Sequence, residues 1–252
     1  NSGQAAAVNR GLKLFSGEYV TWMDSDDIYY PDAIQKKVEF LKRHKEFDFV
    51  LNYGEIVNET DLNHQLGILK RTKPIGKDEL FKDLLDESNV VFCPGTILVK
   101  TESLKKAIPD LDIYESREGQ NWQLMLPLAY CCSVGYLDEV LFKYVVHTDS
   151  HSHTKRTLEQ EYKRRDNFYK LQCETIDKIG TMQKNEKEYW KNYALTRSIL
   201  TKYRMAIYYH NFLESVKKQS ELKERGVKIL WKDGFLSHHF RIITRRIKEI
   251  VG

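Results

Sequence analysis

Three aspartates stand close together near the start of the chain: Asp24, Asp26 and Asp27. They follow residues 19–23, whose alternating, β-favouring side chains predict a short strand. Two carboxylates separated by one residue at the end of a strand can point at the same place, and Mg²⁺ or Mn²⁺ takes oxygen ligands of this kind. A metal held there would bridge a diphosphate. The alternative for an isolated run of this kind is a solvated acidic turn with capping carboxylates.

Helices and strands alternate around this turn. Apolar residues recur at helical spacing between Ser2 and Ser16 and again after Pro31, whereas residues 47–57, 90–100 and 134–146 are rich in β-forming residues. This alternation predicts an α/β fold with a mainly parallel sheet covered by helices on both faces. In open α/β sheets, ligands bind at the carboxyl ends of the strands, which is where the aspartates stand.

The character of the chain changes after Thr154. Residues 158–179 and 189–216 are long, charged and helical in pattern, and no strand candidate follows. We therefore expect a sheet-containing domain over 1–153 and an α-helical C-terminal extension over 154–252. The last residues of the chain predict a basic, one-sided helix that packs onto the protein or lies on an anionic membrane surface.

Composition narrows the function classes. The 252 residues are 41% hydrophobic and 30% charged, which is typical of a globular protein. A net charge of +4 is too small to indicate a nucleic-acid partner by itself. The four cysteines match neither a zinc ribbon nor a secreted disulfide framework, and no apolar run is long enough to span a bilayer. These features predict a cytoplasmic protein.

Several short motifs together resemble the centre of glycosyltransferase family 2 enzymes in order and spacing. They are Asn1-Ser2-Gly3, Asn9-Arg10-Gly11, Ser16-Gly17-Glu18-Tyr19-Val20, Asp24-Ser25-Asp26-Asp27 and Pro31. The resemblance continues at Cys93-Pro94-Gly95-Thr96 and to about His153, with Asn9-Arg10 where Arg-Asn is usual. The family normally begins with a nucleobase-binding segment on the order of 70 residues before the acidic turn, so we expect this chain to lack that segment.

The resemblance implies a GT-A type, Rossmann-like fold and an enzyme that transfers a sugar from a nucleotide-diphosphate sugar with inversion. UDP is the expected nucleotide, Mn²⁺ or Mg²⁺ the expected cofactor, and a glycan, lipid-linked or protein molecule the expected acceptor. The setting would be bacterial surface polysaccharide or glycoconjugate synthesis, in the cytoplasm or at the inner face of the cell membrane.

The resemblance also assigns residues to these roles. The donor-binding set is Asp24, Ser25, Asp26, Asp27, Asn1 and Arg10. The acceptor-binding set is Trp122, Cys93 and Gly95, although Trp122 would equally suit the core of an amphipathic helix. Of the histidines that follow the last predicted strand, His147, His151 and His153, we select His151 to complete the metal site with Asp26.

The general base is where the sequence departs from the family pattern. Many relatives place Glu-Asp after a glycine at the start of a helix, whereas this chain has Gln120 and Asn121 after Gly119. Neutral amides cannot accept the proton of the acceptor hydroxyl. Three accounts stay open: Glu118 or Glu115 is the base, the acidic turn supplies it, or Gln120 and Asn121 bind the acceptor while leaving-group stabilisation drives the reaction. We select Glu118.

Two other function classes compete with a transferase. The first is a non-catalytic nucleotide-sugar-binding or assembly module that keeps the fold and has lost the base, which the amides at 120 and 121 favour. The second is a nucleotide-sugar pyrophosphorylase, which needs a glycine-rich, lysine-containing loop that the sequence does not show.

Overall fold

The computed structural model describes residues 3–71, 79–91, 93–147 and 156–229. These residues fall into two compact units. The first contains the described residues of 1–154 together with 171–187, and the second contains those of 155–170 and 188–252. Helices α6 (Leu158–Lys178) and α7 (Lys184–Tyr208) therefore contribute to both units. A domain boundary at residue 154 stays a prediction.

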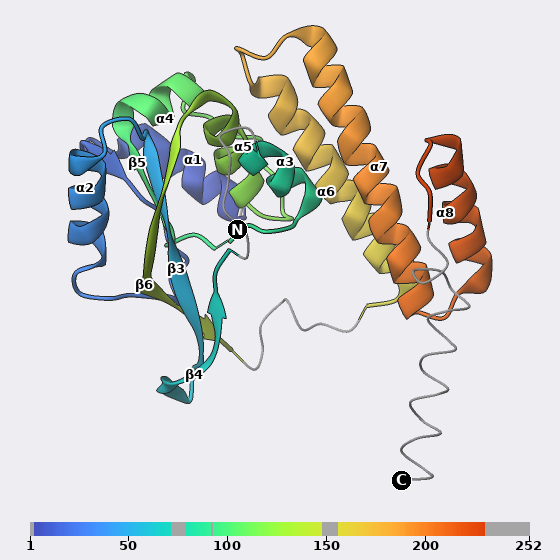
Figure 1. Cartoon of the computed structure of the whole chain (residues 1–252), viewed down its shortest axis with the longest axis horizontal. Coiled ribbons are helices and arrows are strands. Elements are labelled where there is room, and N and C mark those ends of the chain that lie inside the picture. Colours follow the sequence, from blue (N-terminus) through green and yellow to red (C-terminus); the bar gives the residue numbers. More distant parts are fainter. Residues whose placement is uncertain (1–2, 72–78, 92, 148–155, 230–252) are drawn as a thin grey trace. The chain divides into compact units, whose positions relative to one another are not determined.

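The first unit is built on a six-stranded sheet whose order is β1-β5-β3-β6-β2, with β4 paired to β3 (Figure 1). Its strands are β1 (Tyr19–Val20), β2 (Ile28–Tyr29), β3 (Phe49–Asn58), β4 (Asp61–Leu69), β5 (Ile97–Lys100) and β6 (Val134–Val146). The predicted α/β class with flanking helices is confirmed. The expectation of a mainly parallel sheet is wrong for the described strands, because only β3 and β6 run parallel and the other four pairings are antiparallel.

Chain connections explain this mixed sheet. Two residues link β3 to β4, and a link this short joins only antiparallel neighbours. The parallel partner of β3 is β6, which the chain reaches after α3, β5, α4 and α5, a connection long enough for a crossover. The composition and spacing of the strands do not show which neighbours pair in parallel and which pair antiparallel.

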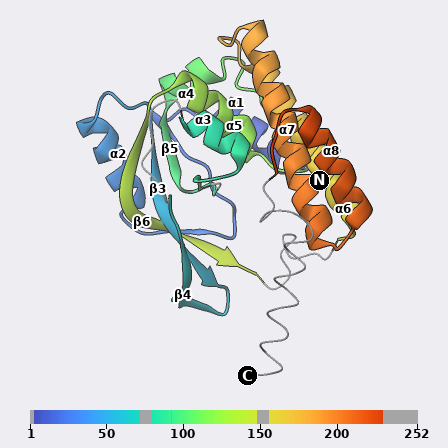
Figure 2. The same ribbon diagram turned by 45° about the vertical axis from the view of Figure 1, so that its right-hand side comes forward.

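Helices cover both faces of the sheet. They are α1 (Gln4–Leu14), α2 (Ala33–Arg43), α3 (Glu79–Asp86), α4 (Thr101–Ala107) and α5 (Asn121–Cys131). Figures 1 and 2 both show α2 on one side of the strands and α1, α3 and α5 on the other. Leu41 of α2 packs with Val50 and Leu98 of the sheet in a buried cluster. The burial of apolar side chains between α2 and the sheet thus stabilises the packing of this helix on the strands.

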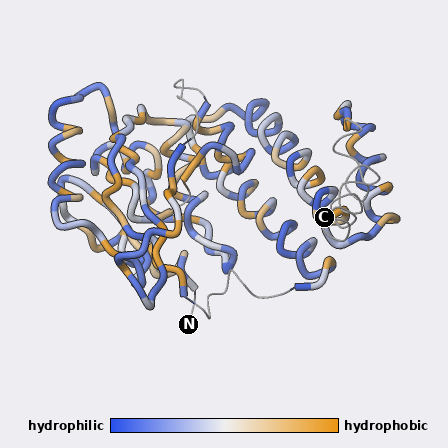
Figure 3. Tube along the Cα trace, turned by 60° about the horizontal axis from the view of Figure 1, so that its bottom comes forward, coloured by the Kyte–Doolittle hydropathy of each residue, from blue (hydrophilic) through white to orange (hydrophobic). Residues whose placement is uncertain are grey.

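The second unit is helical, as predicted for the C-terminal extension. It contains parts of α6 and α7 and all of α8 (Phe212–Glu224). Its core includes Ile199, Tyr203, Ile207 and Leu222. Hydrophobic and hydrophilic residues alternate along these helices (Figure 3), the pattern of helices that bury one side. None of the described helices is long and apolar enough to cross a membrane.

Candidate active site

The acidic turn lies between β1 and β2, and its three aspartates differ in environment. Asp26 is exposed, Asp24 is half-buried, and Asp27 is only 6% exposed. The backbone N–H of Asp27 donates to the carbonyl of Asp24 (3.2 Å) and closes the turn. Asp27 Oδ1 accepts a hydrogen bond from the backbone N–H of Val145 in β6 (3.0 Å). Asp27 therefore anchors the turn to the sheet, while Asp24 and Asp26 are accessible to a ligand.

The turn concentrates negative charge in a partly buried place. Burial, together with the neighbouring carboxylates, raises the pKa of Asp27 to about 6. Burial and the charge of Asp26 also raise the pKa of Asp24. The second carboxylate oxygen of Asp27, Oδ2, is buried and has no hydrogen-bond partner. Three neighbouring carboxylates, one of them with an oxygen that has no hydrogen-bond partner, make a site that is suited to a cation.

His147, directly after β6, is the described histidine beside the acidic turn. Its Nδ1 lies 2.5 Å from Glu59 Oε2, and its Nε2 lies 3.7 Å from Asp26 Oδ2. This Nε2 is buried and has no hydrogen-bond partner. The hydrogen bond to Glu59 raises the pKa of His147 and fixes the orientation of the ring. His151 lies outside the described residues, and so does Asn1.

Asp26 and His147 are chemically suitable metal ligands, but they are only two. Within the described ranges, no three or more His, Cys, Asp or Glu side chains are grouped to hold a metal ion. The orphaned Nε2 of His147 and the unneutralised carboxylates nevertheless fit Mn²⁺ or Mg²⁺, whose remaining ligands would come from a diphosphate and water. The predicted metal role of Asp26 thus has a compatible neighbour.

Gln120 lies next to the acidic turn and is nearly fully buried, at 4% exposed. Its side-chain amide donates a hydrogen bond to Asp24 Oδ1 (3.2 Å), although the two residues are 96 positions apart. The bond favours the charged form of Asp24 and partly offsets the effect of burial on its pKa. The structure therefore brings one member of the predicted Gln120-Asn121 pair to the donor side of the site.

Three other residues with predicted catalytic or acceptor roles, Glu118, Asn121 and Trp122, lie at the start of α5 or in the loop before it. Glu118 is half-buried in the loop before α5, and its backbone N–H donates to Ser116 Oγ (3.1 Å). Asn121 begins α5 and is half-buried. The indole N–H of Trp122 donates to the carbonyl of Leu84 in α3 (3.2 Å), which ties α5 to α3. The roles assigned to these residues stay predictions.

The predicted acceptor residues Cys93 and Gly95 lie in a turn that contacts the segment between β1 and the acidic turn. The Gly95 N–H donates to the carbonyl of Trp22 (2.7 Å). Cys93 is 8% exposed, and burial, reinforced by the nearby aspartates, raises the pKa of its thiol. Arg10, by contrast, is exposed on α1. Cys93 and Gly95 are thus close to the donor-side aspartates.

Two buried polar residues of this region were not selected from the sequence. The Asn9 side chain both donates to and accepts from the backbone of Ile113 (3.0 and 2.8 Å), which holds the segment that leads to Gln120. Lys37 is completely buried in α2. Each interrupts an apolar helical stripe at i+4: Asn9 follows Ala5, and Lys37 follows Ala33. A polar residue within an apolar helical stripe is the sequence pattern that could have indicated these two buried side chains.

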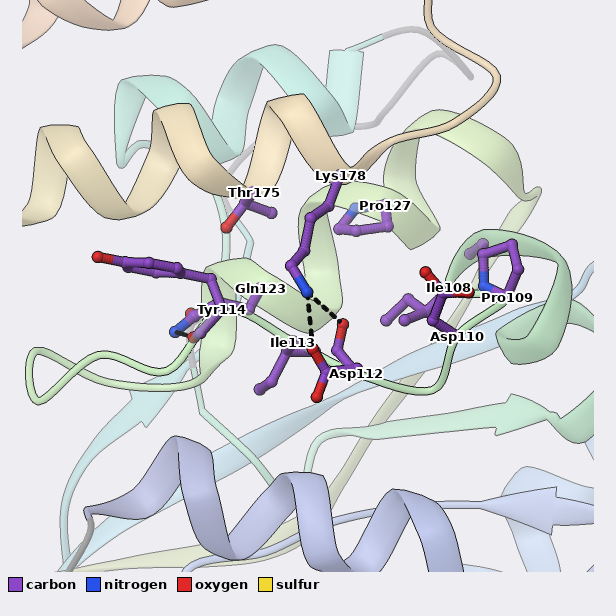
Figure 4. A pocket seen from close by; sticks show the side chains of 11 residues that line it. Ile108, Pro109, Asp110, Asp112, Ile113, Tyr114, Gln123, Pro127, Thr175 and Lys178 are labelled. Atoms are coloured by element: carbon purple, nitrogen blue, oxygen red, sulfur yellow. Dashed lines mark hydrogen bonds and ion pairs between the residues drawn. The ribbon is translucent and has the colours of Figure 1, made fainter.

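A separate small cavity of about 90 Å³ lies among residues 107–114, α5 and α6 (Figure 4). The ammonium group of Lys178 pairs with Asp112 Oδ2 (2.7 Å) at this cavity. Gln123, which also lines it, donates to the carbonyl of Gly119 (2.7 Å) and so holds the residue that precedes Gln120. No residue of the acidic turn lines the cavity, so it is distinct from the candidate donor site.

Comparison with known proteins identifies the family of the part of the chain that carries the acidic turn. Residues 1–108 match the family model described as Glycosyl transferase family 2. Residues 1–108 are a glycosyltransferase family 2 domain. The resemblance seen in the short motifs is confirmed, and this family 2 domain contains the acidic turn and the Cys93–Gly95 turn.

Individual relatives are also named glycosyltransferases. The chain is 27% identical over 164 residues to an uncharacterized glycosyltransferase of Rickettsia typhi, covering 64% of this chain and 50% of that protein. It is 27% identical over 186 residues to an uncharacterized glycosyltransferase of Haemophilus influenzae, covering 70% and 56%. The chain thus spans about half the length of the curated relatives it matches.

A solved structure also has a similar fold. The crystal structure of Staphylococcus aureus TarS superposes with a TM-score of 0.50 and 16% sequence identity, covering 82% of this chain and 36% of that one. At this identity the similarity concerns the fold alone.

Proposed function

We propose that this protein binds a nucleotide-diphosphate sugar at the acidic turn of its family 2 domain and transfers the sugar to an acceptor hydroxyl with inversion. The observation that carries the proposal is the environment of Asp24, Asp26 and Asp27. Asp26 is exposed and Asp24 is half-buried, whereas Asp27 is buried and one of its carboxylate oxygens has no hydrogen-bond partner. The pKa values of Asp24 and Asp27 are both raised. Such a site gains from binding a divalent cation and the diphosphate that the cation would bridge.

In the proposed site, Asp26 and His147 would hold Mn²⁺ or Mg²⁺, with His151 as the further ligand expected from the sequence. When bound, the metal would neutralise the charge that builds up on the departing nucleoside diphosphate. Asp24, oriented by Gln120, would bind the donor. Asp27 would keep the turn on β6. UDP is the proposed nucleotide.

On the acceptor side, the hydroxyl oxygen attacks the anomeric carbon, and the bond from that carbon to the phosphate oxygen breaks. The hydroxyl proton then passes to a carboxylate, for which Glu118 is the proposed base. Gln120 cannot accept this proton, because its amide is neutral and is already engaged with Asp24. The proposed acceptors are glycan, lipid-linked or protein molecules, and the proposed location is the cytoplasm or the inner face of the membrane.

Donor binding with Mn²⁺ provides the test. Calorimetric titration and hydrolysis assays with a panel of UDP- and GDP-sugars should give metal-dependent binding and slow hydrolysis for the wild type. Asp26→Ala should remove both, because it removes one of the two described residues that are proposed to hold the metal. The matched control is Asp32→Ala, since Asp32 pairs with Lys36 at the surface (2.8 Å); it should behave as wild type. If no donor binds in the presence of metal, the proposal is wrong.

A non-catalytic binding module is the second candidate, favoured by the amide at position 120. Under that hypothesis the wild type would bind a nucleotide sugar with metal but would neither hydrolyse nor transfer it. Hydrolysis that disappears in Asp26→Ala would exclude this candidate.

A further inference from the structure

Lys37 is a buried lysine in the first unit that the proposed function does not use. Its side chain is 0% exposed on the inner face of α2. Its ammonium nitrogen donates a hydrogen bond to the carbonyl of Gly95 (2.5 Å) and lies over the ring of Tyr29, 4.7 Å from the ring centre. Burial lowers the pKa of Lys37 to about 7. An apolar residue would fill this place at lower cost, so the hydrogen bond to Gly95 needs an explanation.

The residue that Lys37 binds has little conformational freedom. Gly95 has a left-handed backbone (φ 58°), and a side chain there would collide with the ring of Phe142. The Gly95 turn is thus clamped between the amine of Lys37 and the fully buried Phe142. A small shift of the turn would break the bond on one side or create a clash on the other.

This clamped turn supports the segment between β1 and the acidic turn. The Gly95 N–H donates to the carbonyl of Trp22, two residues before Asp24 (2.7 Å). One position earlier, the Thr21 hydroxyl donates to the carbonyl of Ile97 (2.6 Å). Because that hydroxyl proton is used, Tyr29 must donate to Thr21 (2.7 Å). Residues on both sides of the acidic turn are therefore tied to the segment that Lys37 holds.

We infer that Lys37 is a positioning residue of the donor site, which fixes the acidic turn through the backbone of Gly95 and Trp22. The structural part of this inference is independent of the proposed function. Its consequence for donor affinity rests on that function.

Replacement of Lys37 by methionine separates positioning from ordinary packing. Met has nearly the same length, removes the amine and adds no buried charge. At pH 7 we expect Lys37→Met to unfold at a higher denaturant concentration than the wild type. The Gly95 amide should nevertheless exchange its hydrogen about tenfold faster, and the donor should bind about tenfold more weakly in the presence of Mn²⁺, which is the effect of one lost neutral hydrogen bond.

The control is Lys36→Met, one residue earlier on the same helix. Lys36 is exposed and pairs with Asp32 and Glu139 at the surface (2.8 and 2.7 Å). It should leave the Gly95 amide and the donor affinity unchanged. Should Lys37→Met fail to fold, Lys37→Leu provides the same comparison.

A pH series adds a readout that packing alone would not change. Folded Lys37 loses its proton above about pH 7, while the unfolded chain keeps it up to about pH 10.5. Wild-type stability should therefore rise relative to Lys37→Met between pH 7 and 10. Of the titratable groups on the neighbouring β2 and Cys93–Gly95 segments, Tyr29 and Cys93 have pKa values raised by burial and remain protonated through most of this range.

Unchanged exchange at Gly95 in Lys37→Met, or equal acceleration in Lys36→Met, would overturn the inference. If exchange accelerates as expected but the wild type binds no nucleotide sugar, the proposed function fails and the structural role of Lys37 stands. If exchange accelerates while the donor affinity of Lys37→Met equals that of the wild type, the influence on the donor site is refuted.

Discussion

At the residue scale, the hydrogen bond between Gln120 and Asp24 shows what the amide at position 120 does. The sequence pattern places a carboxylate at position 120 in many family members, and here the side chain is an amide. A carboxylate at the same place would face Asp24, whose own pKa is already raised by burial and by Asp26. The amide instead donates at 3.2 Å and favours the charged form of Asp24. The amide at this position therefore has a physical role in the proposed donor site.

Gln120→Glu tests that role directly. We expect donor affinity in the presence of Mn²⁺ to fall about tenfold at pH 7, because the new buried carboxylate and the half-buried Asp24 repel each other and one of them takes up a proton. Gln120→Met, which removes the hydrogen bond without adding charge, should lose less affinity. Calorimetric titration of both variants provides the comparison. A faster hydrolysis in Gln120→Glu would show instead that position 120 can act as a base.

At the element scale, the Cys93–Gly95 turn positions β1 and the acidic turn relative to β6. Gly95 is pressed against Phe142 of β6, and the same ring leaves no room for a side chain at Gly54 of β3. Cys93 and Phe142 belong to one buried cluster. The turn, β3 and β6 thus share a close-packed contact, and its position determines where the strand before Asp24 can lie.

Gly95→Ala should destabilise the first unit by about 3 kcal/mol, from left-handed strain and from overpacking against Phe142. The matched control is Gly11→Ala in α1, where an added methyl group meets no atom within 4 Å. That change should stabilise the protein by up to about 1 kcal/mol, because alanine favours helix. Urea unfolding curves of the two variants should move in opposite directions. Equal small shifts would contradict the clamp at Gly95.

At the scale of the whole molecule, the first unit extends beyond the sheet-containing part of the sequence. Residues 171–187 belong to it. Leu171, Ile176 and Ile179 are completely buried. Tyr130 of α5 donates to Glu186 (2.6 Å). The end of α6 and the start of α7 are therefore part of the structure that supports α5, whose first turn adjoins Gln120.

Truncation measures this contribution. A chain of residues 1–187 should fold with a clear unfolding transition, whereas residues 1–154 should unfold at a much lower denaturant concentration or fail to fold. Each lost buried aliphatic side chain is worth about 1.5 to 3 kcal/mol. Circular dichroism during urea titration compares the two. Equal midpoints would instead support an independent domain that ends near residue 154.

Much of the fold and part of the site were predictable from the sequence, for local reasons. The spacing of apolar residues predicted α1, α2, α6 and most of α7, and β-forming runs predicted β1, β3, β5 and β6. The elements α3, β2 and β4 were not predicted. The short motifs around Asp24, Asp26 and Asp27 specified the family. The mixed direction of the strands was not predictable, because it depends on which distant strand β3 selects as a neighbour. His147 was considered beside His151, but only its place near Asp26 distinguishes it within the described residues.

The acidic turn itself was thus determined by the sequence alone, since a β-forming run that ends in closely spaced aspartates is a local feature. What surrounds the turn was decided by the tertiary structure. Gln120 reaches Asp24 across 96 positions, and Val145 reaches Asp27 across 118. Lys37 reaches Gly95 across 58. Contacts between residues so far apart in the sequence follow from the packing of helices and strands in the folded protein. No local pattern of residues encodes which pairs will meet.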